Sequence, residues 1–209
     1  MQSSISFGGA LKAHVIRAER APLSWRVRNT LRWSFIWGWL VKWLAWGFSK
    51  VTGAVTMTSE LRARAKHSGV WVDYGVVSRR VVTTTGCTFL RDDFNAGAQD
   101  ITTFKYHGCG TGVAAEAAAD TALGTESTTA LNPDNTRATG SQTTNGTTVY
   151  RTIGTLTFDA SAAITEHGIL SQAATGGGTL WDRSVFSAIN VVSGDSIQFT
   201  YDLTLTAGG

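Results

Sequence analysis

The stretch from Ile197 to Thr206 constrains the fold more than any other part of this sequence. Apolar and polar residues alternate along it without a break, in the order Ile-Gln-Phe-Thr-Tyr-Asp-Leu-Thr-Leu-Thr. A period of two is that of a β-strand with one face buried and the other in water. Because such a face must be covered, the sequence predicts a second sheet packed on the first.

Other runs rich in β-branched residues, bounded by Gly, Asn and Asp, predict further strands. Asn145-Gly146 favours a two-residue hairpin turn between two of them. Short strands separated by turn signals are typical of an antiparallel β-sandwich, of jelly-roll or immunoglobulin-like type. We expect about eight strands, drawn from residues 70–74, 76–85, 87–91, 101–107, 136–143, 149–158, 163–171, 179–192 and 196–206.

Charge divides the chain into two parts. Residues 1–91 hold 14 Lys and Arg against three acidic residues, a net charge of +11. Residues 92–209 hold four against 12, a net charge of −8. This asymmetry predicts a basic N-terminal appendage on an acidic body.

The first 32 residues are typical of an arm that cannot fold alone and is attracted to acidic surfaces. One interpretation is contact with an acidic protein surface or nonspecific contact with nucleic acid, which would depend strongly on salt. The other is a solvated, partly helical tail. The candidate basic contacts are Arg17, Arg20, Arg26, Arg28 and Arg32.

Five of the eight Trp residues fall between residues 33 and 48. On a helix, the small or polar residues Ser34, Gly38, Lys42, Ala45 and Ser49 line one narrow stripe, and large apolar side chains cover the rest. A helix that is apolar almost all round must be buried by something.

Three partners for this helix stay open: neighbouring subunits of an assembly, a membrane surface, or the chain's own domain. The apolar run has about 16 residues, fewer than the roughly 20 that span a bilayer, and Lys42 lies near its middle. We favour burial between subunits over membrane contact. The candidate interface residues are Trp25, Trp33, Phe35, Ile36, Trp37, Trp39, Leu40, Trp43, Leu44, Trp46 and Phe48.

Residues 50–66 turn polar and basic again and are interpreted as a connector, with a second short helix around Glu60 to Lys66. We therefore place the boundary between a Trp-rich helical arm, residues 1–66, and a β-sandwich domain, residues 67–209.

The sequence offers little catalytic chemistry. Cys109 with His107 or His167 is a conceivable nucleophile and base, but there is no nucleophile motif or phosphate loop, and the four His residues lack zinc-ligand spacing. We expect no enzyme activity, no metal and no cofactor. Cys87 and Cys109 are interpreted as small, mostly buried apolar residues, although a disulfide between them stays open.

Two segments resemble a module of tailed-bacteriophage virion proteins, found in head decoration proteins and in tail or baseplate proteins. The first is GCGTGVAAEAAADTALGTE, from Gly108 to Glu126. The second runs from ITEHG at residues 164–168 through TLWDRSVF to SGDSIQFTYDLTL, ending at Leu205. The resemblance covers roughly residues 70–209, and nothing comparable covers residues 1–65.

The resemblance implies a structural protein of the virion, assembled in the cytoplasm of the host bacterium. We favour a capsid decoration (cement) protein that binds the major capsid protein or other virion subunits and forms a homo-oligomer, expected to be a trimer. A tail, neck or baseplate subunit is the alternative, and a membrane-associated protein is the third. Glu166 and Arg183 lie at positions that match the module, where an ion pair between adjacent strands is expected.

Overall fold

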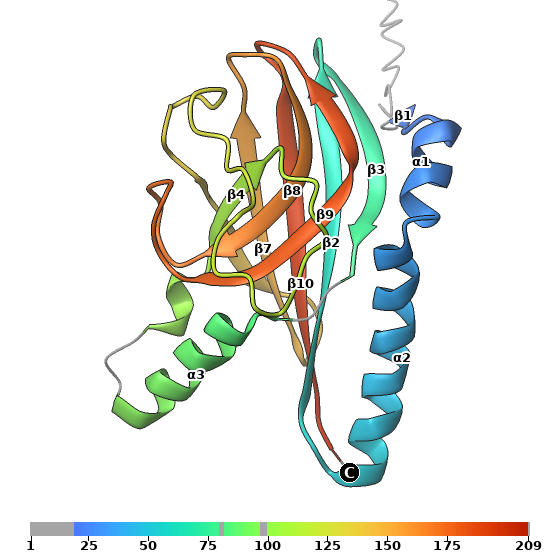
Figure 1. Ribbon diagram of the computed structural model, residues 1–209, viewed down its shortest axis with the longest axis vertical. Coiled ribbons are helices and arrows are strands. Elements are labelled where there is room, and N and C mark those ends of the chain that lie inside the picture. Colours follow the sequence, from blue (N-terminus) through green and yellow to red (C-terminus); the bar gives the residue numbers. More distant parts are fainter. Residues whose placement is uncertain (1–18, 80–81, 97–99, 209) are drawn as a thin grey trace, which may run out of the picture.

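The computed structural model describes residues 19–79, 82–96 and 100–208 (Figure 1). The chain is mainly β and forms two sheets, as the alternating C-terminal strand predicted. The helices are α1 (Leu23–Thr30), α2 (Trp33–Thr52), α3 (Thr84–Ala96) and the 3-10 turn η1 (Ile101–Thr103). The strands are β1 (Glu19–Arg20), β2 (Thr56–His67), β3 (Val70–Ser78), β4 (Tyr106–Gly110), β5 (Ala138–Thr139), β6 (Ser141–Thr144), β7 (Val149–Thr157), β8 (Ala162–Leu170), β9 (Leu180–Val191) and β10 (Ser196–Thr206).

The larger sheet has the strand order β1-β3-β2-β10-β7-β6, and the smaller one β5-β4-β8-β9. All neighbours are antiparallel except β1, which pairs parallel with β3. The hairpin predicted at Asn145-Gly146 joins β6 to β7, and Gly146 has the positive φ of 87° that favours glycine at this position.

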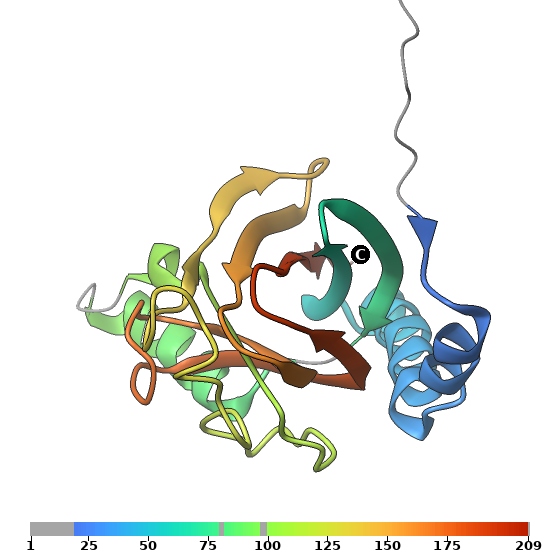
Figure 2. The same cartoon turned by 90° about the horizontal axis from the view of Figure 1, so that it is seen from above.

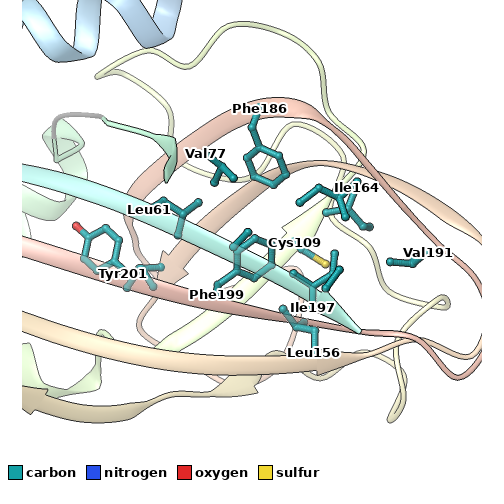
Figure 3. Packing of buried hydrophobic residues seen from close by; sticks show 14 of the residues in the cluster. Leu61, Val77, Cys109, Leu156, Ile164, Phe186, Val191, Ile197, Phe199 and Tyr201 are labelled. Atoms are coloured by element: carbon teal, nitrogen blue, oxygen red, sulfur yellow. The ribbon is translucent and has the colours of Figure 1, made fainter. Parts of the chain in front are cut away.

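One apolar core lies between the sheets (Figure 3). Ile197, Phe199 and Tyr201 enter it from β10, on the face that the alternation predicted, and each is at most 1% exposed. Seen from above, the strands surround this core, and α1 and α2 lie outside it next to β3 (Figure 2).

The segment predicted as a connector contains a central strand instead. β2 alternates buried Leu61, Ala63 and Ala65 with exposed Arg62 and Arg64, and it pairs with β10 from Thr56 to Lys66. Residues 56–66 therefore belong to the β body, and the expected second short helix is absent from this described segment.

Three further expectations were wrong between residues 76 and 107. Strand β3 ends at Ser78, well before the end of the strand expected at 76–85. Helix α3 occupies the positions of the strand expected at 87–91. Thr83 caps the start of α3, because its hydroxyl accepts a hydrogen bond from the Gly86 amide at 3.1 Å. The strand expected at 101–107 begins only at Tyr106 and is preceded by η1.

Helix α1 closes the edge of the smaller sheet. The Trp25 indole donates to the carbonyl oxygens of Ser187 (3.1 Å) and Ala188 (2.8 Å) on β9. The Asn29 side chain accepts from the Ser187 amide at 3.0 Å and donates to the Val77 carbonyl on β3 at 3.0 Å. Two side chains thus satisfy backbone groups at the free edge of β9 and join it to the larger sheet.

Candidate interaction surface

Helix α2 rests on the sheet through its small stripe. Gly38 lies so close to the residue that follows β3 that an added Cβ would meet the carbonyl oxygen of Arg79, and Ser49 is fully buried. Because a bulky residue has no room at these positions, the stripe that was visible in the sequence faces the chain's own body. Lys42, from the same stripe, lines a pocket between α2 and the sheet together with Glu60 and Arg79.

Large apolar side chains cover the rest of α2 and are partly exposed, and three of them, Trp39, Trp43 and Trp46, also line the pocket between α2 and the sheet. With about 150–250 Å² on each aromatic side chain, their partial exposures sum to on the order of 1,000 Å² of apolar surface. The largest apolar patch on a typical monomer is roughly 300–600 Å². We call this surface the aromatic face, and its residues are Ile36, Trp37, Trp39, Leu40, Trp43, Leu44, Trp46, Phe48 and Val51, each 38–87% exposed.

Three of the residues expected at a subunit interface are not among those that form the aromatic face. Trp25 was expected at a subunit interface, but it is only 6% exposed and packs edge-on against Tyr74 at 4.7 Å between ring centroids. Its indole hydrogen bonds to β9 explain this burial. The side chains of Trp33 and Phe35 lie outside the described part of the structure.

The basic residues flank the aromatic face at one end. Arg20, Arg26 and Arg28 are exposed, Arg32 is partly exposed, and Arg17 lies outside the described residues. Between residues 23 and 55 the sequence has five Lys or Arg and no acidic residue. The positive charge near the aromatic face therefore lies mainly at its α1 end.

A glycine substitution tests how α2 is seated. Gly38→Ala should force α2 away from Arg79, at a cost of about 1–3 kcal/mol for overpacking, only partly offset by about 1 kcal/mol of better helix propensity. Urea denaturation followed by tryptophan fluorescence measures the change.

The matched control is Gly47→Ala on the same helix. An added Cβ at Gly47 has no neighbour within 4 Å, so this variant should gain up to about 1 kcal/mol from helix propensity alone. Equal effects at the two glycines would contradict the seating of α2 on its small stripe.

No known relative accounts for this surface. No protein-family model matches the chain, and no curated protein or solved structure is detectably similar to it. The resemblance to phage virion proteins therefore depends on the quoted motifs alone. Within residues 19–79, 82–96 and 100–208, no helix combines the length and apolar character needed to cross a bilayer.

The structure brings Glu166 and Arg183 together on the outer face of the smaller sheet. The Arg183 guanidinium lies 2.8 Å from the Glu166 carboxylate, on the adjacent strands β8 and β9, and their side chains are 4% and 0% exposed. Burial lowers the pKa of Arg183, but its bonds with Asp120 and Glu166 outweigh this effect and raise the pKa overall. Both charges are thus kept in a site closed to water.

This carboxylate also holds the long loop that covers the smaller sheet. Glu166 accepts hydrogen bonds from the backbone amides of Gly112 (2.9 Å), Gly124 (2.9 Å) and Thr125 (2.7 Å). Arg183 adds an ion pair of 3.0 Å with Asp120 in the same loop. The Glu166–Arg183 pair therefore fastens the GTG…DTALGTE segment to the ITEHG strand.

The groups considered for catalysis are buried in the core. His107 and His167 are joined by a hydrogen bond of 2.9 Å between their rings, and both are fully buried. Burial lowers the pKa of His107 to about 3, and burial together with the His107 ring lowers that of His167. Burial also raises the pKa of the Cys109 thiol, so no reactive thiolate forms there at neutral pH.

The two cysteines do not pair in this structure. Cys109 is buried in β4, as expected, whereas Cys87 is exposed on α3. Among the described residues, no group of three or more His, Cys, Asp or Glu side chains is placed to bind a metal ion.

Proposed function

We propose that this chain is a non-enzymatic structural protein of a tailed-bacteriophage particle, most simply a capsid decoration (cement) protein. Its body would be an antiparallel β-sandwich of jelly-roll or immunoglobulin-like type, and its Trp-rich helical arm would bind neighbouring subunits. The observation that supports this proposal is the aromatic face, which is too large to be left in water. The motifs of the body that resemble phage virion proteins indicate that this assembly is a virion.

The energetics favour a subunit partner. Removing about 1,000 Å² of apolar surface from water at about 25 cal/mol per Å² gives a gross term near 25 kcal/mol. Most of this term is offset by the loss of free motion on association. Because α2 is already folded on the body, association carries a smaller entropic cost for ordering this helix.

The partners would be the major capsid protein or other virion subunits, within a homo-oligomer such as a trimer. The basic residues beside the aromatic face would also permit nonspecific contact with nucleic acid. A tail, neck or baseplate subunit would use the same surface. A membrane-associated protein would use it as an interfacial helix, for which Trp residues flanked by basic residues are suitable.

Copy number tests the proposal and separates its forms. Quantitative mass spectrometry of purified virions should give a ratio near parity with the major capsid protein for a decoration protein. A dozen to a few dozen copies would assign the chain to the tail, neck or vertex. Absence from the particle, combined with binding of the purified protein to anionic liposomes, would overturn the virion proposal.

A variant links incorporation to the aromatic face. Trp43→Ser/Leu44→Gln alters two exposed side chains, 64% and 61% accessible, and should reduce incorporation into particles at least tenfold without unfolding the body. The control Val113→Ser/Val192→Ser changes exposed apolar residues elsewhere on the body, 73% and 54% accessible. Equal incorporation of both variants would contradict a role for α2.

A further inference from the structure

Helix α2 meets the larger sheet closely at two points and leaves a pocket between them. Gly38 lies against the carbonyl oxygen of Arg79, and Ser49 is fully buried. These two contacts are 11 residues apart, which is about 16 Å along the helix axis. The pocket between them has a volume of about 520 Å³, within the range of roughly 300–1,000 Å³ that is usual for ligand sites. We call it the α2 pocket.

The two walls of the α2 pocket are chemically different. Helix α2 supplies three indole rings and the Lys42 side chain, at positions 39, 42, 43 and 46, a spacing that places all four on one side of the helix. The opposite wall consists of threonine side chains from β2 and β10 and of Glu60, whose carboxylate lies 2.9 Å from the Arg79 guanidinium. A ligand with an apolar body and a polar or charged head group would match both walls.

Positive charge is in excess around the α2 pocket. Its lining has two cations, Lys42 and Arg79, and one carboxylate, Glu60. That carboxylate is already bonded to two arginines, at 2.6 Å and 2.9 Å. Asp202, opposite Glu60 on β10, is held by Arg151 through two hydrogen bonds of 2.7 Å. Lys42 therefore has no acidic partner among the described residues, and an anionic ligand would supply one.

The polar groups lie toward the Arg79 end of the pocket. This is the N-terminal end of α2, toward which helical side chains tilt, so the Lys42 side chain leans toward Arg79. Thr58 on β2 is only 7% exposed, and its hydroxyl makes no hydrogen bond within the described part of the chain. Trp46 and Thr206 line the other end, away from these charges. The pocket thus has a polar end and an apolar end.

We propose that the α2 pocket binds a single-chain amphiphile with an anionic head group, such as a fatty-acid carboxylate. The carboxylate accepts hydrogen bonds from the Lys42 ammonium and the Thr58 hydroxyl. The hydrocarbon chain lies between the indole rings and the threonine methyl groups and extends toward Trp46. An organic cation would suit the indole rings, but it would meet Lys42 with no free carboxylate to balance it. This inference is independent of the proposed role in a virion.

The test uses the purified full-length protein, with decanoate as the probe at concentrations below those at which it forms micelles. Calorimetry should show a single site per chain, and the tryptophan emission should change on binding. Butyrate has the same head group but buries six fewer methylene groups, so it should bind at least about 100-fold more weakly. Decyltrimethylammonium has the same tail and the opposite charge, and should bind at least about tenfold more weakly.

A lysine variant with a matched control locates the site. Lys42→Met keeps the apolar stem and removes the ammonium, so it should raise the Kd of decanoate at least about tenfold, as expected for a lost hydrogen bond to a charged group. The same variant should not weaken the binding of decyltrimethylammonium. Lys50→Met is the control, because Lys50 is exposed on the same helix and does not line the pocket. It should bind decanoate like the wild type.

Three results would overturn the inference. Equal Kd values for decanoate and decyltrimethylammonium would show apolar adsorption on the aromatic face instead of a site. Equal effects of Lys42→Met and Lys50→Met would remove the head-group contact. Phosphatidylglycerol vesicles present the same chemistry in a bilayer, and binding to them without binding of free decanoate would identify the aromatic face as a membrane contact.

Discussion

Replacing Arg183 with Met is expected to lower the free energy of unfolding by about 3–5 kcal/mol, because it leaves the Glu166 carboxylate buried without its cation. The Met side chain preserves most of the apolar volume, so the loss is electrostatic rather than a packing defect. The loop held by Glu166 and Asp120 should also loosen. Urea denaturation gives the free energy, and hydrogen exchange of the Gly112, Gly124 and Thr125 amides reports on the loop.

Arg91→Met is the matched control. Arg91 pairs with Asp92 at 2.6 Å, but the two side chains are 64% and 40% exposed, and such surface pairs contribute about 0–1 kcal/mol. Adding Glu166→Gln to Arg183→Met should recover part of the stability, because the unpaired charge is then removed. A cost below about 1 kcal/mol for Arg183→Met would contradict the burial of this ion pair.

Acidification from pH 7 to pH 5 is expected to remove about 4 kcal/mol of stability through the two buried histidines. Their folded-state pKa values lie below the ordinary value of 6.5, so below pH 6.5 the unfolded chain binds protons that the folded chain does not. Stability is therefore complete above pH 6.5 and declines as the pH falls, down to about 3 for His107. Each histidine contributes a slope of up to about 1.4 kcal/mol per pH unit.

Urea denaturation at half-unit steps between pH 7 and pH 5 measures this decline, above the range where most carboxylates titrate. His67→Gln removes the remaining histidine of the described part of the chain, which is partly exposed beside Asp195. A decline that persists in this variant belongs to the His107–His167 pair. Constant stability over this range would show that the pair accepts protons in the folded state.

The strands that the sequence predicted best are the long C-terminal strands β7 to β10. β10 alternates because one face meets the core and the other meets water, and β8 and β9 also lie where strands were expected. The turn at Asn145-Gly146 was predicted equally well, because its conformation depends mainly on the two turn residues themselves. Each of these features is encoded within about ten residues.

The errors arose where local propensity and tertiary context disagree. β2 carries Arg62, Arg64 and Lys66, which suggested a polar connector, yet the alternation with Leu61, Ala63 and Ala65 was the signal of a half-buried strand. α3 begins with Thr84-Thr85, residues typical of strands, but a threonine cap and core contacts of Phe89 and Leu90 support a helix.

The candidate site was predicted in part. The small stripe on α2 was visible from its spacing, but the sequence could not tell whether the stripe or the aromatic face meets the body. Trp25 was misplaced because its partners lie on β9, more than 160 residues away, at separations of 162 and 163. The hydrogen bond between His107 and His167 was missed for the same reason, since it depends on the pairing of β4 with β8.

The closure of β9 by α1 has a consequence for synthesis of the chain. The Trp25 indole cannot form its hydrogen bond to Ala188 until that residue, 163 positions later, has been synthesised. At about 5–20 residues per second this takes roughly 10 to 30 s on the ribosome. During that interval α2 has emerged with its tryptophans, but part of the sheet that seats it does not yet exist. Until β9 is made, α1 has no edge to close, and the most apolar segment of the chain is seated only through β2 and β3, exposed to chaperones and to other nascent copies.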